Sequence, residues 1–406
     1  MTWGILAPDT VISQRRQQNL GLAAAVRHFN DRAVPGLGGM WFPMPVLWSV
    51  LAVSIAEELK HPALPIGNAI EALAMQQAKD GPTDRRVRGK RKLQGLNDWS
   101  FQSLTRRGTY VVQPIRMAMV QPLVALGFVE GSRYGAFKIH TAGKRMLELP
   151  VMQRYRHILL AWAKGENPRG LSEVVAGLSA TGEVRSEFRK LILARLVDGD
   201  DAASIRRRNL VALATGPSAA QLESPLPLRS IEPDHWSDLR GGAAFMDLRD
   251  AALSVLDQLE QQLLRRRDAN EPVRLSAEEA QKAAAEQLDA LYQIASRQGE
   301  RITASGESIS NEFLSEINDL RAAGLVRALA ERDGTVICWR GGHLCLGAAA
   351  GEIKVSPDAE EESHPATQND AFAPQLFRLY NLHCLVSELK GKPNPGSRDS
   401  RDLEAA

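Results

Sequence analysis

Apolar residues recur at the three- and four-residue spacing of amphipathic helices over most of this 406-residue chain. Two such stripes lie close together, at 171–178 and 188–196, with a glycine-containing turn between them. A third stretch, Val46–Leu59, is apolar on nearly all sides and predicts a helix buried in a core. The alternation typical of strands is confined to a few short segments. The pattern predicts a mainly α-helical protein with small β-hairpins, in which helix-turn-helix domains are joined by helical segments.

The first strand-like segment follows Gly127, which is placed to end a helix. Phe128–Ser132 and Ala136–His140 are expected to pair through a turn at 133–135, because apolar and polar residues alternate in the second of them. Thr141 is expected to cap the helix that follows.

A similar outline returns nearer the C-terminus. A helical stripe ends at Gly324, and the segments Leu325–Glu331 and Thr335–Arg340 have the composition of strands. The Asp333-Gly334 pair between them is a strong signal for a hairpin turn. A second helix–glycine–hairpin unit is therefore expected here.

Both units resemble the winged-helix family. The matching residues are Leu126-Gly127-Phe128-Val129 with a wing to His140, and Ala323-Gly324-Leu325-Val326 with a wing to Arg340. In that family the helix before the wing enters the major groove of DNA, so the resemblance implies tandem winged helices with a recognition helix ahead of Gly127. Pro114 and Pro122 fall within that helix, and Pro122 departs from the family's pattern because an interior proline kinks or shortens a helix.

Prolines and charge divide the rest of the chain. Two long helices are expected at about Ala243–Arg267 and Ser276–Arg297, and Ser276 with Glu279 forms a capping box at the start of the second. Four prolines interrupt any helix between 215 and 242, which predicts a linker. The expected organisation is an N-terminal helical region (1–83), a basic winged-helix-like unit (84–150), a helix-turn-helix-like region (151–214), the linker (215–242), a helical arm with a second winged-helix-like unit (243–350), an acidic linker (351–372), and a C-terminal helix with a disordered tail (373–406).

Charge is distributed unevenly, although the net charge is only +2. Thirteen lysines and arginines and four acids fall between Asp84 and Pro150, which leaves this segment at +9 and the remainder at −7. Such clustering favours binding of nucleic-acid phosphates over the alternative that these are ordinary solvated surface residues.

In this interpretation Arg85–Lys92 form a flexible arm, because the run has no apolar periodicity. Gln113 and Arg116 lie on the expected recognition helix and read base edges, while other cations contact phosphates. The expected DNA-binding residues are Arg85, Arg86, Arg88, Lys90, Arg91, Lys92, Arg106, Arg107, Thr109, Gln113, Arg116, Arg133 and Lys138.

The second unit differs in charge. Glu307, Glu312, Glu316 and Asp319 load its helix with acid, and this would repel phosphate. If it is a winged helix, it is expected to bind protein.

No catalytic or cofactor motif has supporting context, so neither an enzyme nor a cofactor is expected. Pro35–Gly39 lacks the lysine and hydroxyl residue of a phosphate-binding P-loop. The paired spacing of a zinc site is also missing from the candidate soft ligands, which are Cys338, His343, Cys345, His383 and Cys384. Three cysteines without framework spacing suit a reducing cytoplasm.

Ala33–Ala56 contains no charged residue and is long enough to span a bilayer. Prolines and glycines break its first half, and the helical remainder measures only about 20 Å at 1.5 Å per residue. A buried core helix is expected instead of a membrane span. The N-terminus lacks the pattern of a secretory signal, so a cytoplasmic location is expected.

These observations favour a non-enzymatic protein that binds double-stranded DNA, as a regulator or as the DNA-engaging component of a complex. The alternative is a structural subunit similar to the kleisin-type partners of chromosome-organising or antiviral-defence ATPases in bacteria. In that alternative the winged helices bind protein, and the long helices of 243–297 form an arm or a homodimer interface.

Overall fold

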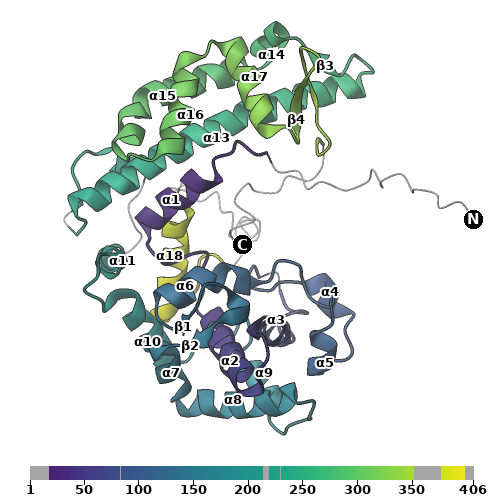
Figure 1. The fold of residues 1–406 in the computed structure, drawn as a ribbon, viewed down its shortest axis with the longest axis vertical. Helices are drawn as coiled ribbons and strands as arrows, with labels where there is room; N and C mark the ends of the chain where they lie inside the picture. Colours follow the sequence, from purple (N-terminus) through teal and green to yellow (C-terminus); the bar gives the residue numbers. More distant parts are fainter. Residues whose placement is uncertain (1–17, 83, 214–218, 229, 352–375, 398–406) are drawn as a thin grey trace, which may run out of the picture. The chain divides into compact units, whose positions relative to one another are not determined.

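The computed structural model describes residues 18–82, 84–213, 219–228, 230–351 and 376–397. Helix makes up 62% of the structure and strand 4%, which confirms a mainly α fold with small antiparallel sheets (Figure 1). The described residues group into two compact units. Unit 1 contains residues 18–29 and 237–351, and unit 2 contains residues 30–236 and 376–397.

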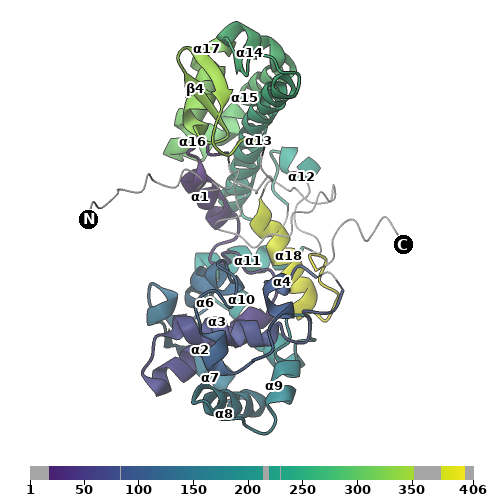
Figure 2. The ribbon, with the colours of Figure 1, turned by 90° about the vertical axis from the view of Figure 1, so that its right-hand side faces the viewer.

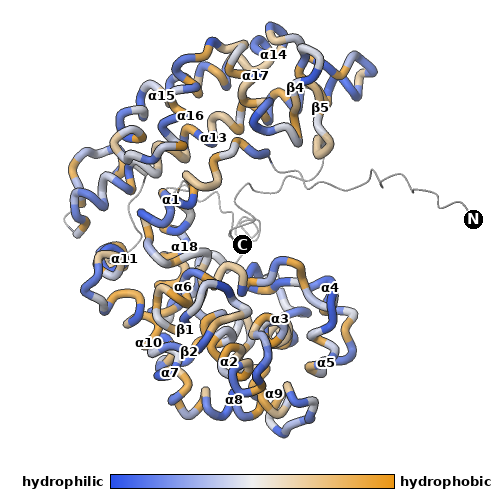
Figure 3. Tube along the Cα trace, in the orientation of Figure 1, coloured by the Kyte–Doolittle hydropathy of each residue, from blue (hydrophilic) through white to orange (hydrophobic). Residues whose placement is uncertain are grey.

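The core of unit 2 is built around α2 (Met44–Leu59) and α3 (Ala63–Ala74), which pack against each other. Every residue of α2 from Met44 to Ala56 is buried, as its apolar sequence predicts, and both helices are visibly apolar in Figure 3. Helix α8 (Pro150–Ala163) packs against α2 as well. Among the described residues, no helix is both long and apolar enough to cross a bilayer.

Further helices complete unit 2 around this core. They are α1 (Ala23–Ala33, which begins in unit 1), α4 (Lys90–Gln94), α5 (Phe101–Leu104), α7 (Thr141–Leu147), α9 (Leu171–Gly177), α10 (Ser186–Val197), α11 (Ala202–Ala212), α12 (Ala219–Glu223) and α18 (Phe377–Leu389). The helices expected at 171–178 and 188–196 are thus present. The expected linker at 215–242 contains α12 and the start of α13 (Pro233–Asp268), because Pro233 lies in a first helical turn, where proline is tolerated.

The expected recognition helix before Gly127 does not form as one helix. The segment contains a 3-10 helix, η1 (Ile115–Met119), and the short α6 (Val120–Ala125). Pro114 precedes η1, and Pro122 has no N–H to continue the α-helical hydrogen-bond ladder. The prolines therefore divide the segment.

The hairpin after Gly127 is present but shorter than expected. Gly127 adopts a left-handed conformation, and the Phe128 N–H donates to the Leu123 carbonyl, as in a Schellman cap. Strands β1 (Val129–Glu130) and β2 (Lys138–Ile139) pair antiparallel, with a 3-10 turn η2 (Tyr134–Ala136) between them.

The expected cap of the next helix is wrong. Helix α7 starts at Thr141 itself, with His140 at the N-cap and no side-chain capping bond. Thr141 therefore lies inside the helix it was expected to precede.

Unit 1 is organised around α13, which lies beside a series of shorter helices in both ribbon views (Figures 1 and 2). Gln258 on α13 donates to the Ala283 carbonyl at the end of α14, and Gln298 on α15 donates to Asp247 on α13. The helices are α14 (Ala277–Ala283), α15 (Ala285–Ala304), α16 (Ser308–Asp319) and α17 (Ala322–Asp333). The capping box predicted at Ser276 and Glu279 is confirmed.

The second expected hairpin was misplaced. Leu325–Glu331 belongs to α17, whose buried residues follow a helical period, and Gly334 ends that helix in a left-handed conformation. The hairpin comes later: β4 (Ile337–Arg340) and β5 (His343–Leu346) join through Gly341-Gly342, both with positive φ. Strand β3 (Arg274–Leu275) completes a sheet of order β3-β5-β4.

Candidate nucleic-acid interface

A surface segment of unit 2 is held in place by a single buried carboxylate. Glu71 on α3 is 1% exposed and accepts hydrogen bonds from the Tyr110 hydroxyl (2.9 Å), the Ile115 N–H (2.7 Å) and the Arg116 N–H (3.0 Å). Burial raises the pKa of Glu71, and the three donors oppose that rise by stabilising the ionised form. We call Tyr110–Arg116 the pinned loop, because both of its ends are bonded to Glu71.

The middle of the pinned loop projects into solvent. Val112 is 79% exposed, and Gln113 is half-buried. A loop with both ends fixed loses less conformational entropy on binding than a free one. The arrangement therefore presents Val112 and its neighbours in a preorganised conformation.

Helix α4 packs against the base of the pinned loop. The Lys92 ammonium donates to the carbonyls of Gly108 (3.2 Å) and Tyr110 (3.1 Å). Gly89, just before α4, has a positive φ, and a Cβ there would lie 2.8 Å from Val111. Only glycine permits this close approach.

This packing gathers four exposed cations: Arg91, Lys92, Arg106 and Arg107. We call these four residues the basic cluster. Between Lys90 and Tyr110 the chain has five basic residues and one acid, Asp98. In the described part of the chain, no residue of the basic cluster forms an ion pair.

The expected flexible arm, Arg85–Lys92, is instead tied to unit 2. The Arg86 guanidinium pairs with Asp84 (2.8 Å) and Glu388 (3.6 Å), and the Lys90 ammonium donates to the Gly81 carbonyl (2.6 Å). Burial alone would lower the pKa of Arg86, but the two carboxylates raise it above its ordinary value. Ion pairs thus anchor a run that lacks apolar periodicity.

The last three residues of this run, 90–92, are the start of α4. Leu93, the next residue of that helix, is fully buried. Arg85 donates its backbone N–H to the Ser397 carbonyl, and Arg88 is half-buried. Only Arg91 and Lys92 of the run are well exposed. The structure therefore brings part of the expected arm to the surface and uses the rest internally.

Arg116, expected to read base edges, is turned inward. Its guanidinium donates to Asn68 on α3 and lies 5.4 Å from the centre of the Tyr134 ring. Burial lowers its pKa. Thr109 is likewise occupied, because its hydroxyl donates to the Ser103 carbonyl (3.1 Å). Gln113 lies before the 3-10 helix and not on a recognition helix.

The hairpin residues have different surroundings. Lys138 stands opposite Glu130 across the β1–β2 ladder, so an acid lies beside its charge. Arg133 is exposed and precedes Tyr134, whose ring fits against Gly67 of α3, where a Cβ would come within 2.8 Å. Arg116 thus links the hairpin turn to the pinned loop through the Tyr134 ring.

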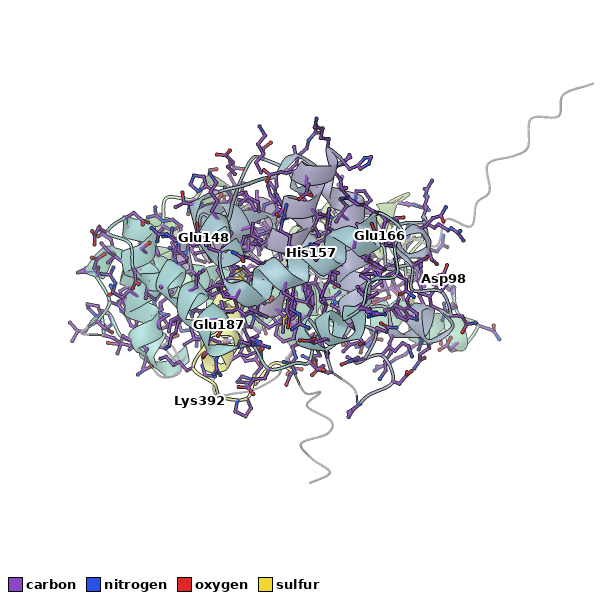
Figure 4. All side chains as sticks on the ribbon, turned by 90° about the horizontal axis from the view of Figure 1, so that it is seen from below. Asp98, Glu148, His157, Glu166, Glu187 and Lys392 are labelled. Carbon is purple, nitrogen blue, oxygen red and sulfur yellow. The ribbon has the colours of Figure 1, made fainter. Side chains whose placement is uncertain are left out.

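Another face of unit 2 carries exposed acids beside exposed cations such as Lys144 and Lys164. Figure 4 shows this face, which α8 crosses, with labelled acidic side chains around His157. These exposed carboxylates are Asp98, Glu148, Glu166 and Glu187. We place the candidate interface at the basic cluster and the pinned loop, because Asp98 is the one acid between Lys90 and Tyr110.

Sequence reasoning missed Glu71 and Val112. A signal for Glu71 existed, since it is a lone acid within the apolar run Ala69–Met75. Nothing in the sequence indicated that its partners would come from residues about forty positions later.

The soft-ligand residues singled out in the sequence fall into different units. Cys338, His343 and Cys345 belong to unit 1, and His383 and Cys384 belong to unit 2. Within the described ranges, no group of three or more histidine, cysteine or acidic residues has the arrangement of a metal site. The three cysteines are free thiols.

No protein-family model matches this chain, and no curated protein or solved structure does either. The candidate interface therefore rests on the residues of this chain alone.

Proposed function

We propose that this protein binds double-stranded DNA without catalysing a reaction, and that unit 2 does so through the basic cluster. The supporting observation is the gathering of four exposed cations around a preorganised loop, none of which forms an ion pair within the described residues. Lysine and arginine that neutralise phosphates release condensed counterions, which favours binding. The protein would act as a regulator or as the DNA-engaging part of a complex.

The mode of contact differs from that of a recognition helix. Helix α6 has six residues, and the inward position of Arg116 removes the expected base reader. Contacts from the basic cluster would instead go to the sugar–phosphate backbone, which confers affinity with little sequence information. The proposal is therefore binding with weak sequence preference.

Salt dependence tests this proposal. Four phosphate contacts would give a log–log slope of affinity against salt of about −3.6, from about −0.9 per contact. Replacing Arg91, Arg106 and Arg107 with alanine should reduce the magnitude of that slope by about 2.7 and weaken all duplex sequences alike. Lys92 is kept in this variant because it also holds the pinned loop.

A matched control removes the same charge elsewhere in unit 2. Lys144, Arg145 and Lys164 are exposed, so their triple alanine variant has the same net charge as the test variant. It should keep nearly the wild-type slope. Equal losses in the two variants, or no duplex binding by the wild type at low salt, would contradict the proposal.

A second candidate concerns unit 1, as a winged-helix-like module that binds protein. Strand β3 precedes α14, the hairpin β4–β5 follows α17, and the sheet order is β3-β5-β4. This order of elements is similar to that of a winged helix, with α17 in place of the helix expected to end at Gly324. It supports the alternative of a structural subunit in an ATPase complex.

The acids expected to repel phosphate are partly used within unit 1. Glu307 caps α16, Glu316 pairs with Arg332 (2.7 Å), and Asp319 accepts from the Ser315 hydroxyl (2.9 Å). Glu312 is exposed on the same helix. Of these acids, Glu316 has its charge balanced by an arginine, whereas Glu307 and Asp319 accept hydrogen bonds from neutral donors.

Phe313 and Ile317 on α16 are fully buried, so polar variants there would disrupt the core and not a partner surface. A surface test reverses the charge of exposed residues, Glu312→Lys with Arg327→Glu on α17. If unit 1 docks an ATPase subunit, this variant should fail to co-assemble with it in gel filtration while keeping its DNA affinity. Unchanged assembly would contradict the second candidate and leave the first intact.

A further inference from the structure

The sheet of unit 1 places two thiols directly opposite each other. Cys338 on β4 and Cys345 on β5 are register partners, and the Cys338 sulfur lies 3.7 Å from the Cys345 carbonyl oxygen. Opposed residues of an antiparallel pair share a face, with Cα atoms about 4.5–5.5 Å apart. Disulfides accept Cα separations of about 4.4–6.8 Å. The spacing expected at this register therefore falls within the range that a disulfide accepts.

The two thiols differ in access to solvent. Cys338 is 6% exposed, and burial raises its pKa, with Arg340 opposing that rise. Cys345 is half-buried. Cys338, Cys345 and Arg274 form one row of register partners across the sheet. Arg274 on β3 is exposed, so solvent reaches the row beside Cys345. A small oxidant would meet Cys345 first.

The opposite face of the sheet is mostly buried, with Trp339 and Leu346 half-buried. Ile337, Leu344 and Leu275 alternate with the cysteine row and are at most 2% exposed. Among the described residues, no third ligand accompanies the thiols to form a metal site. The chemistry open to this pair is therefore that of two adjacent thiols.

We propose that Cys338 and Cys345 form a redox-modification site, at which a hydroperoxide produces an intramolecular disulfide. In the first step the Cys345 sulfur attacks the peroxide, the O–O bond breaks, and an S–O bond forms. The products are a sulfenic acid and an alcohol, or water when the oxidant is hydrogen peroxide, and the thiol proton goes to the departing oxygen.

In the second step the Cys338 sulfur attacks the Cys345 sulfur. The S–S bond forms as the S–O bond breaks, and the hydroxide leaves with the Cys338 proton as water. Two thiols lose two electrons in total, and one peroxide is reduced. Because the disulfide joins β4 to β5, it covalently fixes the register of this hairpin.

Cys384 provides an internal control. It lies in α18 of unit 2, is fully buried, and burial raises its pKa to about 12. It has the least access of the three thiols and should not react.

The test exposes the reduced full-length chain to stoichiometric hydrogen peroxide with dimedone, which traps sulfenic acids. Alkylation under denaturing conditions and peptide mapping then locate every remaining thiol. We expect equal loss of the Cys338 and Cys345 thiols, one intramolecular linked peptide, and an unreacted Cys384. Dithiothreitol should restore both thiols. In Cys338→Ser, dimedone should accumulate on Cys345, whereas in Cys345→Ser, Cys338 should stay mostly reduced.

A wild-type chain whose Cys345 accumulates the dimedone adduct while Cys338 remains a thiol would overturn the proposal. So would linkage between molecules in place of linkage within one, or thiols that resist peroxide in the folded chain. The wild-type map decides the matter even if a serine variant fails to fold. None of these outcomes depends on DNA binding.

Discussion

Each unit contains a buried carboxylate that collects hydrogen bonds from several donors, and the two are used differently. Glu71 lies inside α3 and binds both ends of a loop whose middle is exposed. Asp333 lies at the end of α17 and accepts from the Thr335 hydroxyl (3.0 Å) and the Ile337 N–H (2.7 Å), which follow it directly. Glu71 thus holds a surface loop in unit 2, whereas Asp333 stabilises a tight turn in the core of unit 1.

The difference lies in where the donors come from. All donors to Glu71 are far along the chain, so the carboxylate joins separate segments. Asp333 has mostly local donors, with one distant addition, the Asn19 N–H (3.1 Å). A local network forms together with its helix end, whereas the Glu71 network needs the whole unit to be assembled. We therefore expect the two carboxylates to differ in how strongly their removal affects the protein.

The largest effect should come from Glu71→Ala. It leaves a buried hydroxyl, the buried Ile115 N–H and the partly buried Arg116 N–H without an acceptor, and each buried group costs about 1–3 kcal/mol. We expect unit 2 to lose about 3 kcal/mol or more of its free energy of unfolding, measured by urea denaturation. Tyr110→Phe removes one of these bonds and should cost about 1 kcal/mol. A loss for Glu71→Ala no larger than that for Tyr110→Phe would show that the loop is not held by this carboxylate.

Asp333→Ala should have a smaller effect, about 2 kcal/mol, confined to unit 1. Its donors include the half-buried Thr335 hydroxyl, which water can satisfy when the carboxylate is gone. Amide hydrogen exchange should report increased opening at 334–337 and unchanged protection of α3. Loss of protection in α3 would contradict the separation of the two networks.

The two carboxylates should also make the free energy of unfolding of their units depend on pH in the same direction. Burial raises the pKa of both Glu71 and Asp333, so the folded chain binds their protons more tightly than the unfolded chain does. Their stabilising contribution is full below the ordinary pKa of each and is lost as pH rises through the folded pKa. Each pKa unit corresponds to about 1.4 kcal/mol.

The Glu71→Gln variant isolates one of these titrations. The free energy of unfolding of the wild type minus that of Glu71→Gln should fall between pH 5 and pH 8. Denaturation at both pH values measures the difference. A difference that rises with pH would mean that the donors to Glu71 outweigh its burial.

The smallest effect should come from Val112→Ala. Because Val112 is 79% exposed, its methyl groups contribute little to the core, and we expect a change within about 0.5 kcal/mol. Val336→Ala is the matched control in unit 1, since Val336 is fully buried and should lose at least about 1 kcal/mol. Similar losses in the two variants would show that the pinned loop folds back on unit 2 in solution.

Local patterns in the sequence determined several elements of this protein. The buried helix α2, the capping box at Ser276 and the glycine cap at Gly127 were all predictable, because each depends on residues within a few positions of one another. Pro122 also signalled that the helix before Gly127 would be kinked or shortened, and α6 is indeed only six residues long.

Tertiary structure decided the remainder. Leu325–Glu331 has a composition compatible with either strand or helix, and burial of one face against unit 1 made it α17. Arg116 and Arg86 looked like free cations in the sequence. In the fold, Arg116 contacts Asn68 and Tyr134, and Arg86 pairs with Glu388. These partners lie between about 20 and 300 residues away in sequence. Side-chain charge is a local property of the sequence, but whether a charge meets solvent or a partner depends on which distant segments the folded core brings beside it.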